Sequence, residues 1–175
     1  MDVYLRPGIA KALLMLFSAE LAGTAQAAQQ TKDFTFLLLP RGSASLREYR
    51  GKVVALGFYS TTCPHCLLMC TIMEKLYVQY RNRGFEPLGI ASNPSAPRTL
   101  GDFVKYAKVT YPMGYASPQT VSAYVGLDLK KGMAVPQMLL IDRSGAIRYR
   151  ADPADTNLFS EEAWRSRVVQ LLDSR

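Results

Sequence analysis

Cysteine and histidine are scarce in this sequence. Its 175 residues include three cysteines and a single histidine, His65. Three cysteines do not make a disulfide-stapled scaffold, because two of them, Cys63 and Cys66, stand within four positions of each other. A zinc site would need further ligands, and His65 between the two cysteines is poorly placed to complete a tetrahedron. The cysteine pattern therefore favours a redox pair, and we expect no metal and no organic cofactor.

Acidic residues are outnumbered, and no dense basic tract compensates for them. Lysine and arginine total 21 against 14 aspartates and glutamates, which gives a net charge of +7. The densest basic runs are Arg81-Asn82-Arg83 and Lys130-Lys131, so the charge predicts a solvated basic surface and no nucleic-acid partner. Hydrophobic residues make up 49% of the chain and charged residues 20%, as expected of one folded domain.

The sequence also lacks an apolar run of the roughly 20 residues that cross a bilayer comfortably. The N-terminus has two basic residues, a short apolar stretch at residues 12–19 and a small-residue site at Ala25-Gln26-Ala27. This pattern predicts an export signal over residues 1–27 and a single domain over residues 28–175. The alternative is an N-terminal extension on a cytosolic protein. Export predicts a periplasmic or otherwise oxidising location, with the protein either released or held at the membrane by an uncleaved signal.

Apolar runs and helical periodicities alternate along the rest of the chain, which predicts a mixed α/β sandwich. Two continuous apolar runs read as strands covered on both faces, and an Asp-Arg-Ser-Gly turn between two further runs predicts a hairpin. The predicted strands cover residues 34–39, 53–59, 85–91, 137–141 and 146–150, with a short extended piece at 111–113. The predicted helices cover residues 64–83, 100–107, 119–125 and 161–172, with a helical turn at 45–49.

Cys63-Pro64-His65-Cys66 stands where a buried strand runs into a helix. Thr62 is a suitable N-cap, and Pro64 suits the first helical turn. Free backbone N–H groups and the helix dipole stabilise an anion there, so Cys63 is the expected attacking thiolate. Cys66, one turn further on and more shielded, is expected to resolve the mixed disulfide.

Two neighbours of this pair each allow two interpretations. His65 could stabilise the Cys63 thiolate by hydrogen bonding or by charge, or it could be an exposed residue with no electronic role. Cys70 lies one helical turn after Cys66 on the same helix face. We expect Cys70 to be a core residue, since free cysteine is commonly buried, although a second resolving thiol or a copper ligand fits the spacing.

The segment 51–58, continuing into 62–66, resembles the TlpA/ResA-like thioredoxins of the wider redoxin group. Residues 34–36 and 135–145 carry the same resemblance, which extends from Phe34 to the C-terminus. It implies a thioredoxin-like three-layer sandwich with a central mixed sheet and a redox Cys-x-x-Cys at a helix N-terminus. It also implies that Cys63 is the nucleophile and Cys66 the resolving thiol.

The resemblance further makes Val135-Pro136 a cis-proline site that faces the cysteines, where the Val135 backbone would meet an extended substrate. Gly57, six positions before Cys63, departs from the family, because thioredoxins keep a buried aspartate there. Thr62 replaces the usual tryptophan. The Cys-Pro-His-Cys motif itself matches strongly oxidising DsbA-like proteins, so the direction of electron flow stays open.

These observations predict an exported thiol–disulfide oxidoreductase that exchanges its Cys63–Cys66 pair with protein thiols and disulfides. A second protein, which could be membrane-bound, would restore its redox state. One alternative is a copper(I) metallochaperone using Cys63 and Cys66, with or without Cys70. The other is a thiol peroxidase, in which Ser60 would replace the threonine that peroxiredoxins place three residues before the reactive cysteine.

Overall fold

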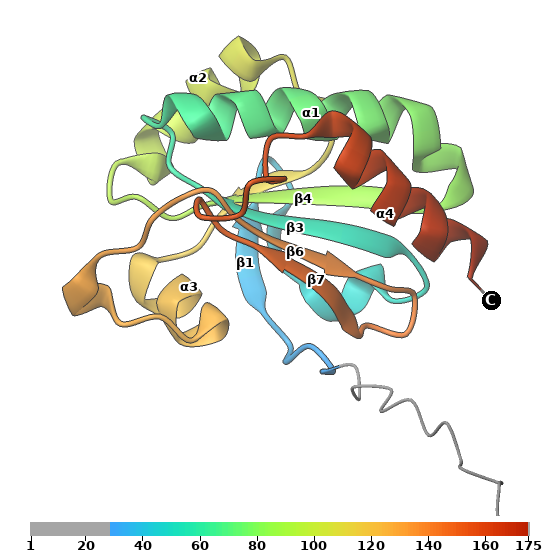
Figure 1. The fold of residues 1–175 in the computed structure, drawn as a ribbon. Coiled ribbons are helices and arrows are strands. Elements are labelled where there is room, and N and C mark those ends of the chain that lie inside the picture. Colours follow the sequence, from blue (N-terminus) through green and yellow to red (C-terminus); the bar gives the residue numbers. More distant parts are fainter. Residues whose placement is uncertain (1–28, 175) are drawn as a thin grey trace, which may run out of the picture.

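A mixed sheet of seven strands forms the middle layer of the molecule (Figure 1). The computed structural model describes residues 29–174. Within these residues the strand order is β2-β1-β5-β4-β3-β6-β7. The two central strands, β3 (Val53–Tyr59) and β4 (Phe85–Ala91), run parallel and are buried at every position. This is the burial expected of the two continuous apolar runs.

The remaining elements flank that pair. The other strands are β1 (Thr35–Leu38), β2 (Gly42–Ser45), β5 (Met113–Tyr115), β6 (Gln137–Ile141) and β7 (Ile147–Ala151). The α-helices are α1 (Pro64–Tyr80), α2 (Ala96–Ala107), α3 (Pro118–Val125) and α4 (Glu161–Asp173). Three short 3₁₀ helices are η1 (Leu46–Tyr49), η2 (Arg81–Arg83) and η3 (Leu129–Lys131).

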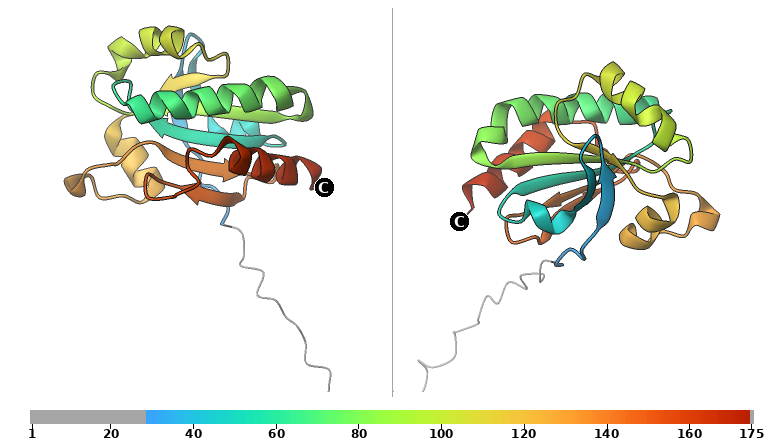
Figure 2. Two further views of the ribbon diagram at one scale, coloured as in Figure 1. Left: turned by 45° about the horizontal axis from the view of Figure 1, so that its top comes forward. Right: turned by 180° about the vertical axis from the view of Figure 1, so that it is seen from behind.

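Helices cover both faces of the sheet, so the protein has the three layers that the sequence predicted. One core cluster joins α1, α2 and α4 to the sheet and includes Trp164 and Tyr59. The other lies under η1 and α3 and includes Phe34, Phe36 and Phe58. Figure 2 shows α3 on the face opposite α1 and α4. The thioredoxin-like sandwich with a mixed central sheet is therefore confirmed.

The differences from the predicted elements are local. Strand β2 was missed because its sequence, Gly-Ser-Ala-Ser, carries no apolar run, and pairing with β1 makes it a strand. Helix α2 begins at Ala96, four residues before the predicted start, with a proline in its first turn. Helix α1 ends at Tyr80, and η2 then reaches the left-handed Gly84.

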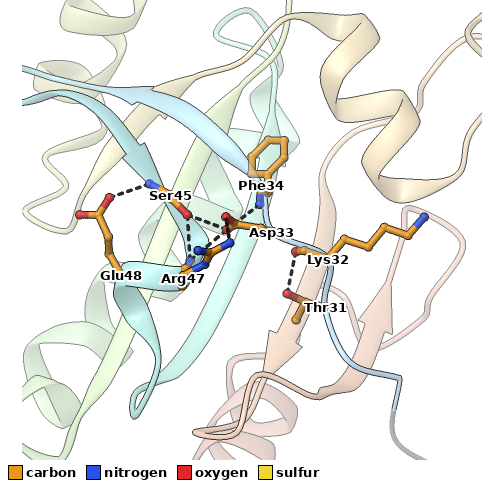
Figure 3. Close-up of polar contacts among 7 residues, drawn as sticks. All are labelled: Thr31, Lys32, Asp33, Phe34, Ser45, Arg47 and Glu48. Atoms are coloured by element: carbon orange, nitrogen blue, oxygen red, sulfur yellow. Dashed lines mark hydrogen bonds and ion pairs between the residues drawn. The ribbon is translucent and has the colours of Figure 1, made fainter.

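A cluster of polar contacts fixes the start of β1 (Figure 3). The Asp33 carboxylate accepts from the Ser45 hydroxyl at 2.6 Å and from the Arg47 N–H at 3.2 Å. Ser45 also caps η1, and the Glu48 carboxylate accepts the Ser45 N–H at 2.8 Å. This reciprocal capping box ties β1, β2 and η1 together at one edge of the sheet.

The predicted export signal, residues 1–27, lies outside the described residues. Among residues 29–174 no helix is long and apolar enough to cross a membrane.

Candidate active site

The cysteine pair lies where the loop after β3 enters α1. Cys63 is the N-cap of α1, and its sulfur accepts the Cys66 backbone N–H at 3.3 Å. The prediction of Thr62 as the cap was wrong by one residue. The Thr62 hydroxyl is instead 3.0 Å from the Ser60 hydroxyl, and the Cys63 sulfur takes the capping role usually filled by an oxygen. The sulfur of Cys63, the predicted nucleophile, thus closes the first turn of α1.

The second part of the site is the peptide bond between Val135 and Pro136, which is cis as expected. The Cys63 thiol donates to the Val135 carbonyl, with 3.8 Å between sulfur and oxygen. Strand β6 begins directly after this bond and pairs with β3, so the sheet brings residues 72 positions apart into contact. The Val135 backbone thus lies beside Cys63, the predicted nucleophile.

Cys66, the predicted resolving thiol, is enclosed. Cys66 has no exposed surface, and its sulfur accepts the Ser60 backbone N–H at 3.5 Å. Burial raises the pKa of the Cys66 thiol well above its ordinary value, and the Ser60 N–H acts in the opposite direction. Cys63, in contrast, is partly exposed, and both thiols are free. The pair therefore has one accessible sulfur and one shielded sulfur.

Cys70 is a core residue, as expected. It has no exposed surface and packs in the cluster between α1 and the sheet. Burial raises the pKa of its thiol to about 12, although the Tyr111 hydroxyl acts in the opposite direction. Among residues 29–174 no group of three or more His, Cys, Asp and Glu side chains could hold a metal ion. The three sulfurs thus do not gather into the site that a three-thiolate copper carrier would need.

Tyr59 fills the space beside Gly57, where thioredoxins keep their buried acid. A Cβ atom built on Gly57 would lie 2.3 Å from the Tyr59 hydroxyl oxygen and 2.9 Å from the Met138 sulfur. The Tyr59 hydroxyl donates to that sulfur at 3.5 Å, and burial raises the pKa of Tyr59 well above its ordinary value. No side chain longer than glycine fits at position 57 while Tyr59 keeps this position. Beside Gly57 the interior therefore contains the Met138 sulfur and the Tyr59 phenol, whereas thioredoxins have a carboxylate at this position.

His65 is exposed, and its ring lies against Phe159 from the loop before α4. The ring centroids are 5.5 Å apart with the planes tilted by 38°. Sequence reasoning did not find this contact, because Phe159 is 94 positions away and belongs to no recognised motif. Phe159 is part of the wall of the site, and the electronic role of His65 stays a prediction.

Asn93, which sequence reasoning also missed, anchors the loop that carries the cysteines. Its side-chain oxygen accepts the Thr61 N–H at 2.9 Å, and its amide donates to the Thr61 hydroxyl at 3.0 Å. The same hydroxyl is 2.7 Å from that of Thr99 on α2. Asn93 follows β4 as Thr61 follows β3, and the parallel pairing of these strands brings both to one edge. The polar run Ser92-Asn93-Pro94-Ser95 after β4 was the available signal in the sequence.

The arrangement of sheet, helices and cysteine pair defines a protein of thioredoxin-like fold. The chain belongs to the AhpC/TSA family, whose model matches residues 27–150. It is 31% identical over 123 residues to the thiol–disulfide oxidoreductase ResA of Halalkalibacterium halodurans, covering 70% of this chain and 66% of that protein. The resemblance to ResA-like proteins is thereby confirmed. The chain spans slightly less than two thirds of the length of the curated relatives it matches.

Solved structures agree on the fold. A putative protein disulfide isomerase from Bacteroides thetaiotaomicron superimposes with a TM-score of 0.70 at 26% identity, covering 84% of this chain and 90% of that one. A putative thiol:disulfide interchange protein DsbE from Chlorobium tepidum gives a TM-score of 0.68 at 21% identity, over 83% of this chain and 96% of that one.

Proposed function

We propose that this protein is an exported thiol–disulfide oxidoreductase acting on cysteines of other proteins, with Cys63 as nucleophile and Cys66 as resolving thiol. The observation that carries the proposal is the position of the Cys63 sulfur. It is partly exposed, accepts the Cys66 N–H at the start of α1, and lies 3.8 Å from the Val135 carbonyl. A helix N-terminus stabilises a thiolate, and the Val135 backbone beside Cys63 suits an extended substrate.

The chemistry in the reducing direction takes two exchanges. The Cys63 thiolate attacks one sulfur of a substrate disulfide, and the other substrate sulfur leaves as a thiolate and takes up a proton. Cys66 then loses its proton to solvent and attacks Cys63. The bond between Cys63 and the substrate breaks, and the second substrate thiol is released. Two electrons pass from the dithiol to the substrate, and the oxidising direction is the reverse.

Burial gives the two thiols their different tasks. Cys63 is reachable and Cys66 is not, so a substrate reacts first with Cys63. Because burial raises the pKa of Cys66, its thiol stays protonated in the resting dithiol and does not compete for substrate. When Cys66 attacks as a thiolate, the hydrogen bond from the Ser60 N–H stabilises its negative charge.

Trapping the mixed disulfide tests this assignment. Cys66→Ser, incubated with a disulfide-bonded protein such as insulin, should accumulate a covalent adduct seen by mass spectrometry, whereas Cys63→Ser should form none. Cys70→Ser is the matched control and should turn over like the wild type. Adduct formation by Cys63→Ser, or loss of turnover in Cys70→Ser alone, would contradict the assignment. Peroxide consumption faster than disulfide exchange would favour a peroxidase.

Two further measurements address direction and location. A glutathione titration of the pair gives its reduction potential. A value near that of thioredoxin, about −270 mV, would indicate a reductant, and a value near that of DsbA, about −120 mV, would indicate an oxidant. Export with cleavage after Ala27 predicts that the protein from a periplasmic extract begins at Ala28. An intact N-terminus in the membrane fraction would indicate a retained signal.

A further inference from the structure

A short segment next to the cis peptide projects from the body of the protein. Residues 127–134, called here the basic arm, join α3 to Val135. In Figures 1 and 2 this segment extends beyond the sheet at the end where α1 begins. Leu127 and Leu129 are each 38% exposed, and Lys130 and Lys131, which follow them in the chain, are exposed as well. Apolar and basic side chains thus occur together in a segment that leads directly to Val135.

The basic arm is held in shape by its own hydrogen bonds. At its root, the Ser122 carbonyl accepts the Leu127 N–H at 3.0 Å. In the middle, the Asp128 carboxylate accepts the Lys130 N–H at 2.9 Å and caps η3. At the far end, the Gln137 amide donates to the Ala134 carbonyl at 2.9 Å. The arm does not need a partner to order it, and a preformed surface loses less entropy on binding.

A cavity of about 450 Å³ lies at the root of the basic arm. Leu127 and Gln137 line it from the two ends of the arm, and Val125 and Leu139 contribute apolar surface. Arg150, Asp152 and Asp155 contribute charged groups to the same lining. Gln137 is two residues after Val135, so the cavity opens close to the backbone that faces Cys63. Its size is sufficient for one large side chain.

The charge of the basic arm is not balanced locally. Within residues 29–174 neither Lys130 nor Lys131 takes part in an ion pair. Asp128, the one acidic residue of the arm, is occupied in capping η3. Below the arm, the Asp152 carboxylate accepts the Ala154 N–H at 2.8 Å, and the Asp155 carboxylate accepts the Tyr149 hydroxyl. Lys130 and Lys131 are therefore cationic groups of the arm that no carboxylate among the described residues pairs with.

We propose that the basic arm selects protein substrates whose reactive cysteine lies in an extended segment with acidic residues and one large apolar residue nearby. The acidic side chains meet Lys130 and Lys131, and the apolar side chain enters the cavity beside Leu127. The proposal rests on the proposed function, since it assigns the substrate class of the same site. Charge complementarity of this kind raises association rates and selects against like-charged partners.

Peptide disulfides test the basic arm directly. Two peptides of equal length, each with one cysteine bound to 2-mercaptoethanol, carry either two glutamates or two lysines beside an apolar residue. At low salt the wild type should react with the acidic peptide about tenfold faster than with the basic one, and salt should reduce the difference. The double variant Lys130→Glu, Lys131→Glu should reverse the preference. Leu127→Ala should slow the reaction of the acidic peptide. A third, acidic peptide with alanine in place of the apolar residue should react equally with Leu127→Ala and with the wild type.

The controls separate this proposal from the proposed function. Lys105→Glu with Lys108→Glu makes the same charge change at the end of α2 and should leave the preference unchanged. Hydroxyethyl disulfide, which is small and uncharged, should react equally with every variant. If it fails to react with the wild type, the proposed function is wrong. If it reacts but the wild type shows no charge preference, or the α2 variant loses the preference equally, the role of the basic arm is refuted. Loss of binding to anionic vesicles in the arm variant, with peptide rates unchanged, would likewise refute it.

Discussion

Replacing Cys70 with alanine isolates one source of alkaline instability in the protein. Cys70 is fully buried, and burial raises the pKa of its thiol from 9.0 to about 12. A raised pKa in the folded state means that the unfolded chain loses this proton first as the pH rises. The stability contributed by keeping Cys70 protonated is therefore complete below about pH 9 and is lost progressively between about pH 9 and pH 12.

The size of the effect follows from the two pKa values. At pH 10 an unfolded cysteine with a pKa of 9.0 is mostly ionised, while the folded thiol with a pKa of about 12 is not. Linkage then lowers the free energy of unfolding by about 1.4 kcal/mol relative to pH 7. Cys70→Ala has no such proton, so the wild type's stability margin over the variant should shrink by that amount.

Urea unfolding of the reduced proteins at pH 7 and pH 10 measures this margin. With an m-value of about 2 kcal/mol per M, the difference between the two midpoints should change by about 0.7 M. Tyrosines with raised pKa values destabilise both proteins equally and cancel in the comparison. A margin that is the same at both pH values would refute the reasoning, because Cys70 would then ionise as readily in the folded protein as in the unfolded chain.

Three further substitutions test the surroundings of the cysteines. Gly57→Ala should lower the free energy of unfolding by about 1–3 kcal/mol in urea titrations, because its Cβ overlaps the Tyr59 hydroxyl, and a neutral result would mean that the tyrosine moves freely. Asn93→Ala leaves the Thr61 N–H without its acceptor, so it should lower the free energy of unfolding by about 1–3 kcal/mol and slow disulfide exchange. An unchanged midpoint of urea unfolding would exclude this anchor. His65→Ala should make the reduction potential more negative by about 30 mV if His65 stabilises the thiolate, and an unchanged potential would leave only the Phe159 contact.

The central part of the fold could be read from the sequence because its signals are local. The runs at Val53–Tyr59 and Phe85–Ala91 are apolar throughout, and the Cys-x-x-Cys follows the first of them directly. Strand β2 was invisible for the opposite reason, since its four small residues become a strand through pairing with β1. Local sequence patterns thus predict most of the strands, whereas a strand such as β2 depends on its pairing partner in the sheet.

The site divides in the same way. Cys63 and Cys66 were found because they belong to a short motif, and Val135-Pro136 because residues 135–145 resemble the TlpA/ResA-like thioredoxins. Phe159 and Asn93 were missed because their importance arises from contacts with residues 94 and 32 positions away. The N-cap was misplaced because Thr62 carries the more common capping group, and the structure gives that place to a sulfur.

The packing of Tyr59 over Gly57 also constrains the paths by which this interior can change. Restoring an acid at position 57 requires that Tyr59 first become smaller, because the Cβ of the new side chain and the phenol occupy the same space. Shrinking Tyr59 alone leaves a hole behind Cys66, and adding the acid alone causes an overlap. Each single change is expected to lower the free energy of unfolding, so an acid at position 57 and a tyrosine at position 59 exclude one another. Proteins with this tyrosine would be expected to keep the glycine, and the two positions should vary together among relatives.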